Sequence, residues 1–456
     1  MSTLHSYDRR TFLQSAAAAT LAAVAGRARA AERRRLKVAA VFTEFTYRSH
    51  AHVILENFLQ PYYFNGQVTD PGCDVVSFYA DQLPAGRDMA REVSKVYKIP
   101  LFPTITDALC VGGKELAVDA VLSIGEHGTY PTNAKGQHEY PRKRFFDDIA
   151  AVIRPTGRAV PVFNDKHLSY RWDWAKAMYD TAREMNLPFM AGSSVPLAQR
   201  IPPLEIPAGA KITEGLVTHG GSLDSYDFHA YEVLQSMVEA RSGGETGVAS
   251  VQYLGPDSLR RAADAGQWSP DLLQAAWDAE QRKEGRQTLD ELWKSQPWGV
   301  LVQYRDGLRG LILKVSGDGT RWNFACRVAG ESKPLATNFY VGPWRNRCLF
   351  KALAHAIQTH FRDGKPPYPV ERTLLTTGLV EAGVESHARG DRPYETPHLD
   401  IKYTPTDYRA MREMGDSWKI VTEATEEAKG IDRLGKAMPP PPPPGTEGGY
   451  NPVRKK

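Results

Sequence analysis

The sequence predicts an α/β protein with two main domains, the first built on a doubly wound parallel sheet. Three observations support this fold class. Short apolar runs alternate with amphipathic segments between Leu36 and about Met190, which is typical of successive βαβ units. A proline-rich joint follows at residues 201–207, and further runs of strand length begin at Val248. The length of 456 residues leaves room for two or three domains.

Each expected element of the first domain follows from its hydrophobic period, which is about 3.6 residues in a helix and 2 in a strand. The expected strands are Lys37–Phe42, Asp74–Tyr79, Val118–Ile124, Ala159–Phe163 and Pro188–Gly192. The expected helices are His50–Phe58, Asp88–Tyr97, Thr106–Leu109, Arg142–Ile153 and Trp172–Met185. Residues 65–72 and 130–141 are interpreted as loop insertions.

The second domain is expected to begin at residue 203. Its expected strands are Val248–Tyr253, Val300–Tyr304 and Leu308–Val315, and its helices include one that starts near Ala230, Leu349–Phe361 and one that ends near Ser386. Beyond residue 400 the composition changes, and a run of six prolines, Pro439–Pro444, precedes a basic end. Such a segment is expected to be extended. The predicted organisation is a leader at 1–31, domains at 32–202 and 203–400, and an extension at 401–456.

The first 31 residues have the pattern of an export signal. Arg9 and Arg10 precede Phe12-Leu13, a short apolar run covers Ser15–Ala25, and Ala28-Arg29-Ala30 matches a cleavage site. The paired arginines resemble a twin-arginine signal, so we expect a periplasmic or otherwise exported protein with no stable membrane anchor after cleavage. A membrane anchor or an amphipathic helix is the alternative. Without this segment 53 basic and 52 acidic residues remain, which gives no electrostatic case for a nucleic-acid partner.

Residues 160–168 place a charged cluster, Asp165-Lys166-His167, at the end of an apolar strand that an amphipathic helix follows. Open α/β sheets bind ligands at the carboxyl ends of their strands. The cluster is therefore a candidate active site. A strand-end salt bridge is the alternative.

Several stretches, in this order, resemble the glucose–fructose oxidoreductase, inositol dehydrogenase and MocA (Gfo/Idh/MocA) family. They include Val76–Asp81, Tyr97-Lys98-Ile99-Pro100, Val118–Ile124, Val162–Leu168, Asn186–Gly192 and Gly220–His229. Residues 349–386 match the family's closing helices. The resemblance covers about residues 36 to 390.

The resemblance implies a Rossmann-like domain followed by an α+β domain with a mostly antiparallel sheet. It also implies an oxidoreductase that acts on a sugar or cyclitol hydroxyl with NAD or NADP, and a homo-oligomer. Lys166 stands at the position of the family's lysine, which holds a substrate hydroxyl and assists its proton transfer. His229 matches the family's acid–base histidine, and either Asp224 or Asp227 could orient it. A strand-end ion pair for Lys166 and a core or capping role for His229 are the alternatives.

The cofactor turn departs from the family. A dinucleotide turn needs G-x-G-x-x-G so that backbone amides reach the pyrophosphate, but Phe42, Glu44 and Tyr47 occupy the three glycine positions. Glu44 would place a carboxylate against a diphosphate. Asp81, at the end of the second strand, could still accept hydrogen bonds from a ribose, or it could be a helix cap.

Glu126 and His127 follow the third strand and are expected to face the same cleft, as cofactor-binding candidates. Imidazoles and carboxylates around this cleft could ligate a divalent metal. These are Glu126, His127, His138, Glu139, Asp165, His167, His219 and His229. No pair has H-x-x-H or H-E-x-x-H spacing on one element, so we predict no metal site. The four cysteines have no zinc-like spacing either.

Three functions remain open after this comparison. The first is an exported oxidoreductase with an unusually held nicotinamide. The second is a relative that has lost NAD(P) binding and serves as a carbohydrate-binding protein or as a non-redox lyase or hydrolase. The third is a scaffold that uses only its C-terminal sheet. We predict an oxidoreductase-like protein, with the second function as the alternative.

Overall fold

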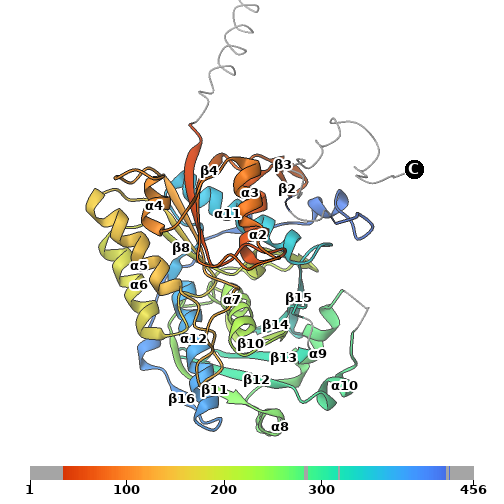
Figure 1. Cartoon of the computed structure of the whole chain (residues 1–456). Helices are drawn as coiled ribbons and strands as arrows, with labels where there is room; N and C mark the ends of the chain where they lie inside the picture. The colour runs from red at the N-terminus through yellow and green to blue at the C-terminus, as the bar shows by residue number, and fades with distance from the viewer. Residues whose placement is uncertain (1–33, 282–285, 317–318, 428–430, 432–456) are drawn as a thin grey trace, which may run out of the picture.

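The computed structural model of the chain describes residues 34–281, 286–316, 319–427 and 431. It confirms the predicted fold class, because a parallel sheet flanked by helices is followed by a second, mostly antiparallel sheet (Figure 1). The expected leader at 1–31 and the proline run lie outside the described residues. In the described part of the chain, no helix is long and apolar enough to cross a membrane.

The first sheet has six strands in the order β5-β4-β1-β6-β7-β8, and all neighbouring strands are parallel. Its strands are β1 (Leu36–Phe42), β4 (Cys73–Ala80), β5 (Leu101–Phe102), β6 (Ala120–Ile124), β7 (Val162–Asp165) and β8 (Phe189–Gly192). The helices between them are α2 (His50–Leu59), α3 (Ala90–Tyr97), α4 (Ile105–Cys110), α5 (Arg142–Ile153) and α6 (Trp172–Glu184). The strand order reverses between β1 and β6, which is where sheets of this type hold ligands.

Strand β1 shows why the sheet is covered on both faces. Val38, Ala40 and Phe42 pack in one buried cluster with α2 and α3, whereas Ala39 and Val41 pack in another with α4, α5 and α6. All five side chains are fully buried. A strand that is apolar on both faces is the pattern of an interior parallel strand.

The second sheet has eight strands in the order β16-β11-β12-β13-β10-β14-β15-β9, in which only β10 and β13 pair in parallel among the pairs described. The strands are β9 (Gln199–Ile201), β10 (Ile212–Gly220), β11 (Val248–Leu254), β12 (Trp298–Tyr304), β13 (Arg309–Ser316), β14 (Asn323–Val328), β15 (Leu335–Tyr340) and β16 (Tyr394–Glu395). The helices are α7 (Ser225–Val238), α8 (Pro256–Asp264), α9 (Pro270–Ala279), α10 (Leu289–Lys294), α11 (Asn346–Asp363) and α12 (Val370–Ala388).

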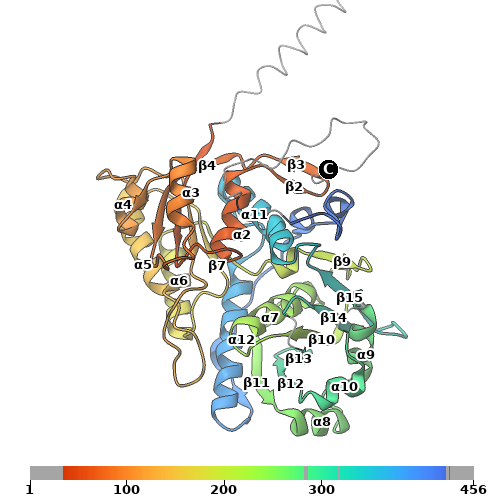
Figure 2. The ribbon, with the colours of Figure 1, turned by 45° about the vertical axis from the view of Figure 1, so that its right-hand side comes forward.

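The last two long helices tie the sheets together. Helix α11 packs against α2, and α12 contacts α6 and β8 on one side and α7 and β11 on the other. Figure 2 shows α12 running between the two sheets. One continuous apolar cluster therefore extends from the first sheet into the second, so α7 is held against the carboxyl edge of the parallel sheet.

Strand β7 differs from its predicted range. It begins at Val162 rather than at Ala159 and continues through Asn164 to Asp165. Pro161 lacks the N–H that a ladder position needs, so it marks the start of the strand. The consequence is that Asp165 is the last strand residue and Lys166 the first residue after it.

The two expected loop insertions behave differently. Residues 62–69 form a hairpin of β2 (Tyr62–Phe64) and β3 (Gln67–Thr69). Residues 130–141 form a loop closed by a bridge between Thr132 and His138. The backbone N–H of His138 donates to Asp224 Oδ2 at 3.1 Å, so this loop connects the first domain to the second.

Candidate active site

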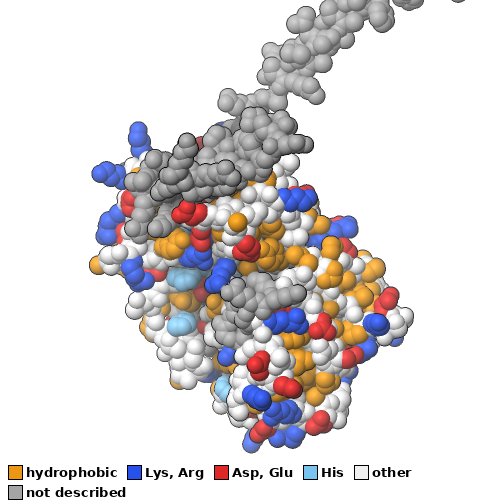
Figure 3. Space-filling model, turned by 90° about the vertical axis from the view of Figure 1, so that its right-hand side faces the viewer, with side chains coloured by type: hydrophobic (Ala, Val, Ile, Leu, Met, Phe, Trp, Pro, Cys, Tyr) orange, Lys and Arg blue, Asp and Glu red, His pale blue; other side chains and the backbone are white. Residues whose placement is uncertain are grey.

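A cavity of about 400 Å³ lies where the carboxyl ends of β6 and β7 face the start of α7. Four of its lining residues follow strands of the parallel sheet, namely His50, Glu126, His127 and Lys166. Ser225, Tyr226 and His229 line it from the second domain. Histidine side chains also gather on one part of the surface shown in Figure 3. The structure therefore brings together residues that are far apart in the sequence.

Lys166 occupies the turn that leaves β7. Its backbone has a φ of 67°, a left-handed conformation that is uncommon outside glycine and recurs at functional sites. Its Nζ lies 3.3 Å from Glu126 Oε1 and donates to the carbonyl of Ser225 at 3.3 Å. The Asn164 Nδ2 donates to the carbonyls of Asp165 and His167 and so braces this turn. The lysine is thus held in place by contacts from both of its neighbours in the cavity wall and by the braced turn.

Glu126 lies between two cations in the wall of the cavity. Arg142, the first residue of α5, donates to Glu126 Oε2 and has a fully buried side chain. Burial alone would raise the pKa of Glu126, but Lys166 and Arg142, with His50 and His127, lower it well below its ordinary value. Glu126 is therefore a carboxylate at neutral pH, and its negative charge is used to hold Lys166 and Arg142.

His50 and Asp165 form a second acid–base pair. His50 Nδ1 lies 2.6 Å from Asp165 Oδ2, and both side chains are nearly buried. This contact orients the imidazole and leaves its Nε2 as the nitrogen available to a ligand, since His50 lines the cavity. Sequence reasoning did not select His50 as a site residue. The available signal was its position at the start of the helix that follows β1.

His127 has a φ of 74° and its Nδ1 accepts the backbone N–H of His50 at 3.3 Å. Burial lowers the pKa of His127 to about 4, and His50 and Lys166 contribute to this shift. A neutral His127 therefore caps the first turn of α2. Its Nδ1 accepts a backbone N–H at the N-terminus of α2 that would otherwise be available to an anionic ligand.

His167, which follows Lys166, is buried and is not among the residues that line the cavity. Its Nε2 lies 3.0 Å from Arg142 Nη1. Because arginine only donates, Nε2 accepts and the ring proton is on Nδ1. Burial, followed by the charge of Arg142, lowers the pKa of His167 well below its ordinary value. His167 supports Arg142 rather than the ligand.

His229 reaches the cavity from the first turns of α7. Its Nδ1 lies 2.6 Å from Ser193 Oγ, and this oxygen also accepts the backbone N–H of Val195 at 3.1 Å. When the Ser193 hydroxyl donates to Nδ1, the ring proton of His229 is on Nε2. Burial, with the charges of Lys166 and His50, lowers the pKa of His229 well below its ordinary value. The result is a neutral imidazole with an N–H donor.

The two aspartates that could have oriented His229 have other partners. Asp224 accepts the backbone N–H of His138, and Asp227 Oδ1 lies 3.3 Å from His219 Nε2 in the interior. Burial raises the pKa of Asp227 well above its ordinary value and lowers the pKa of His219 to about 3. Both shifts favour the neutral form of the two side chains. The orienting group of His229 is Ser193, a residue that the sequence pattern did not indicate.

Aromatic rings form the wall opposite Lys166. The rings of Tyr226 and Trp322 are nearly parallel, at 7°, with centroids 6.2 Å apart. Added Cβ atoms at Gly221 or Gly319 would lie 2.2 Å from the Tyr226 ring, so both positions require glycine. Such apolar faces beside a few polar groups are typical of small-molecule sites.

The region that would hold a dinucleotide does not fit one. Phe42, at the first glycine position, packs edge-on against Phe45 and Phe78 in the core. Glu44, at the second, is 4% exposed and accepts from Thr46 Oγ1 at 3.0 Å. Side chains therefore occupy the space in which backbone amides would approach a pyrophosphate.

The C-terminal extension lies against the same turn. Glu427 accepts hydrogen bonds from Tyr47, at the third glycine position, and from Arg48 and Arg347. The backbone N–H of Ile431 donates to His52 Nε2 at 3.1 Å. A carboxylate of the chain itself thus neutralises the basic groups beside this turn.

Asp81 is held by three donors of the chain itself among the described contacts. Its Oδ1 accepts from Tyr79 at 2.6 Å and from Arg144 at 2.5 Å. Its Oδ2 accepts from the hydroxyl of Tyr130 at 2.7 Å. Burial would raise the pKa of Asp81, but these three donors lower it. The described residues in this part of the sheet are thus satisfied by one another, and no standard NAD(P) cradle is present among them.

Among the residues that the structure describes, no group of three or more histidine, cysteine or acidic side chains is arranged to hold a metal ion. The four cysteines, which all lie in the described ranges, are buried and unpaired.

Comparisons with known proteins bear on the fold. No family model matches the sequence, and the comparison with curated proteins gives no match either. GenD2 from gentamicin A biosynthesis, solved in complex with NAD, has 14% identity and a TM-score of 0.52, with 79% of this chain and 96% of that chain covered. A probable dehydrogenase from Thermotoga maritima has 12% identity and a TM-score of 0.50, covering 80% and 100%. The scyllo-inositol dehydrogenase from Lactobacillus casei has 11% identity, a TM-score of 0.49 and coverage of 80% and 98%. The chain is therefore similar in fold to GenD2 and to the probable dehydrogenase from Thermotoga maritima.

Proposed function

We propose that this protein is a non-redox enzyme that carries out acid–base chemistry on a small polyhydroxylated molecule of the sugar or cyclitol class. The observation that carries the proposal is the convergence of His50, Lys166 and His229 on one cavity. Its volume of about 400 Å³ lies in the range of small-molecule sites. The residues in the place of a dinucleotide cradle support a reaction without a nicotinamide.

The three groups have complementary roles. His50, oriented by Asp165, accepts a proton from a substrate carbon next to a carbonyl group. The Lys166 ammonium stabilises the negative charge that develops on the carbonyl oxygen. His229 Nε2–H donates a hydrogen bond to the oxygen that leaves from the neighbouring carbon, and His50 passes to that oxygen the proton it took from carbon. One C–H and one C–O bond break, one C=C and one O–H bond form, and His50 ends in the protonation state in which it began.

The lining of the cavity favours this elimination over hydrolysis by two carboxylates. A glycosidase needs a pair of carboxyl groups on either side of the bond that breaks. Among the described residues that line the cavity, Glu126 is the one carboxylate, and Lys166 and Arg142 hold it. Proton transfer by imidazoles is thus better supported than hydrolysis.

A nicotinamide-dependent oxidoreductase is the second candidate. It is supported by the similarity in fold to GenD2, which was solved with NAD, and by the place of Lys166 at the end of β7. It requires a cofactor held without glycines at positions 42, 44 and 47.

Isotope exchange and cofactor binding separate these candidates. The full-length protein is incubated in D2O with hexoses, inositols, uronates and keto sugars, and deuterium incorporation is followed by NMR. We expect exchange in the wild type and a fall of about 10²- to 10⁴-fold in Lys166→Met and in His50→Asn. His387→Asn is the matched control, because His387 forms an exposed histidine–aspartate pair with Asp391 outside the cavity.

Cofactor binding is measured on the same preparations by calorimetry and by mass spectrometry of the purified protein. We expect neither NAD nor NADP to bind. Stoichiometric NAD(P), or its reduction in the presence of any of these substrates, would refute the non-redox proposal in favour of the oxidoreductase.

Export by the twin-arginine route is also proposed, on the support of the Arg9-Arg10 pattern and the short apolar run after it. Replacement of both arginines by lysine is expected to retain the protein in the cytoplasm, as measured by cell fractionation. Equal export of the variant would contradict this route.

A further inference from the structure

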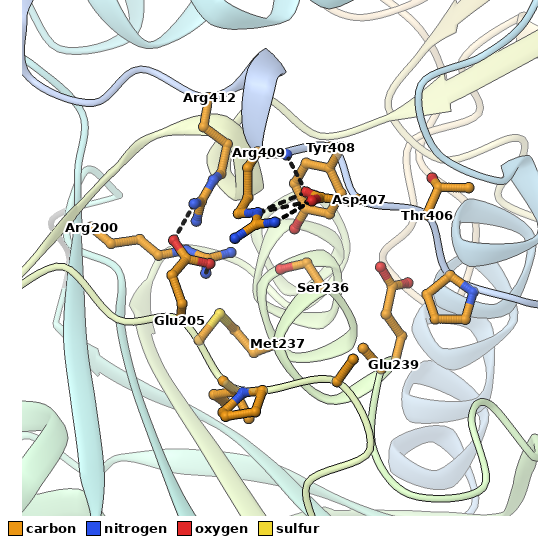
Figure 4. A pocket seen from close by; sticks show the side chains of 15 residues that line it. Arg200, Glu205, Ser236, Met237, Glu239, Thr406, Asp407, Tyr408, Arg409 and Arg412 are labelled. Carbon is orange, nitrogen blue, oxygen red and sulfur yellow. Dashed lines mark hydrogen bonds and ion pairs between the residues drawn. The ribbon is translucent and has the colours of Figure 1, made fainter.

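A second cavity, of about 390 Å³, lies apart from the candidate active site and shares no lining residue with it among those described. It is formed by β9, the last turn of α7, the loop at residues 205–208 and the segment at residues 405–412. Figure 4 shows Arg200 of β9 close to Arg409 and Arg412 of the 405–412 segment, with the hydroxyl of Ser236 below them. Neither the fold nor the proposed function accounts for this concentration of guanidinium groups.

The charges around the cavity leave one arginine without a full counter-charge. Three arginines each have a carboxylate partner, in the pairs Arg372–Glu239, Arg409–Asp407 and Arg412–Glu205. The fourth is Arg200, whose Nη1 donates to the carbonyl of Leu204 at 2.9 Å and lies 3.4 Å from Glu205, the carboxylate that Arg412 also uses. Its guanidinium also lies over the Phe339 ring and interacts with Tyr408.

Arg200 is nevertheless largely buried, with 9% of its side chain exposed. Its Nε has no hydrogen-bond partner among the described residues. Burial lowers the pKa of Arg200 and Arg412 lowers it further, although Tyr408 and Glu205 act in the opposite direction. A buried guanidinium with a free donor is stabilised by an anion, and a carboxylate matches its planar geometry.

The facing wall offers acceptors instead of donors. The Ser236 hydroxyl donates to the carbonyl of Val233 at 2.8 Å, so its oxygen is left to accept. The Glu239 carboxylate also lines the cavity. These oxygens suit ligand hydroxyl groups, whereas Met237, Ile206 and Pro405 supply apolar surface for a carbon skeleton.

We propose that this cavity binds a small hydroxycarboxylic acid of the sugar-acid class. The carboxylate of the ligand pairs with Arg200, and its hydroxyls donate to Ser236 and Glu239. The four arginines around the cavity exceed their three carboxylate partners by one positive charge, which favours a monocarboxylate over a phosphate dianion. The proposal does not depend on the reaction at the first cavity.

The test is calorimetric titration of the full-length protein with four probes, D-gluconate, benzoate, D-glucitol and inorganic phosphate. We expect D-gluconate to bind most tightly, benzoate more weakly because it has no hydroxyls, and D-glucitol not at all because it has no carboxylate. No binding of D-gluconate at millimolar concentration, or tighter binding of phosphate, would overturn the proposal.

Variants assign the binding to this cavity. Arg200→Gln is expected to weaken D-gluconate binding about tenfold or more, and Arg200→Lys to retain part of it. Ser236→Ala is expected to weaken D-gluconate several-fold and to leave benzoate unchanged, and it keeps the test decisive if Arg200→Gln fails to fold. Lys166→Met is the control for the first cavity and is expected to leave D-gluconate affinity unchanged. Unaltered D-gluconate affinity in folded Arg200→Gln or in Ser236→Ala would overturn the assignment.

Discussion

Two neighbouring stretches at the carboxyl edge of the parallel sheet differ in what their charged side chains contact. At the ends of β1 and β4, Glu44 and Asp81 are engaged by groups of the chain itself. At the ends of β6 and β7, Glu126 and Lys166 line a cavity. We refer to the first stretch as the closed edge and to the second as the open edge.

Helix α5 shows the difference most directly, because it supplies one arginine to each edge. Arg142 pairs with Glu126 at the open edge, and both side chains are almost fully buried. Arg144 pairs with Asp81 at the closed edge, but its side chain is 47% exposed. Helix α5 thus makes one ion pair that is partly exposed to solvent, Arg144–Asp81, and one that is buried in the wall of the cavity, Arg142–Glu126.

The largest expected effect is that of Arg142→Met. Its removal takes one of the two cations from buried Glu126, and breaking a buried pair costs about 3–5 kcal/mol of unfolding free energy. Arg144→Met, two residues along the same helix, is the matched control and is expected to cost less than about 1 kcal/mol because its pair is exposed. Urea denaturation measures both values. Equal losses would show that the two edges do not differ in burial of charge.

A smaller effect is expected from pH. His127 at the open edge has its pKa lowered from 6.5 to about 4, first by burial and then by the charge of His50. In this window the unfolded chain binds a proton that the folded chain does not, so stability rises with pH and is lost as pH falls from 6.5 toward 4. The contribution of this group is roughly 3 kcal/mol.

Unfolding curves measured across this pH range test the assignment. His127→Gln is expected to reduce the slope of the unfolding free energy against pH, since glutamine has no titrating group. Asp81 at the closed edge has its pKa lowered from 3.8, so its contribution is lost only below that value. Asp81→Asn should leave the slope between pH 6.5 and 4 unchanged, and an equal change in slope in both variants would contradict the distinction between the edges.

The smallest expected effect is that of Glu427→Ala at the closed edge. Tyr47, Arg48 and Arg347 lose a shared acceptor, but Glu427 is partly exposed, so the loss of stability is about 1 kcal/mol. Glu426→Ala, its exposed neighbour, is the control and should be neutral in thermal unfolding. NAD should remain unbound in both variants, because Phe42 and Glu44 still occupy the turn. Binding of NAD to Glu427→Ala would show that the extension alone closes this edge.

The strands and helices of the first domain were predictable to within a few residues, because burial on both faces or on one stripe leaves a local period. Lys166 could be selected as a candidate site residue for the same reason, since it follows an apolar run that has the length and pattern of a strand. The start of β7 was predicted too early. The apolar character of the sequence extends back to Ala159, but Pro161 has no N–H for the ladder, so the strand begins at Val162.

The partners at the candidate site were not predictable in this way. Arg142, Ser193 and Asp165 acquire their roles through contacts with Glu126, His229 and His50, and these partners lie 16, 36 and 115 residues away in the chain. A single sequence carries no signal for such pairings. Asp224 and Asp227, which lie nearer to His229 in the sequence, contact His138 and His219 in the structure.

The sequence by itself determined the fold class, the order along the chain of the segments that form the parallel strands, and the absence of glycine at positions 42, 44 and 47. Each of these depends on residues that are neighbours in the sequence. Only the tertiary structure decided what replaces those glycines and which charges surround Lys166. Packing brings α7, α11 and the C-terminal extension against the sheet edge, and burial then sets which groups are charged. The cluster that ends β7 is thereby turned from a strand-end ion pair into one wall of a cavity.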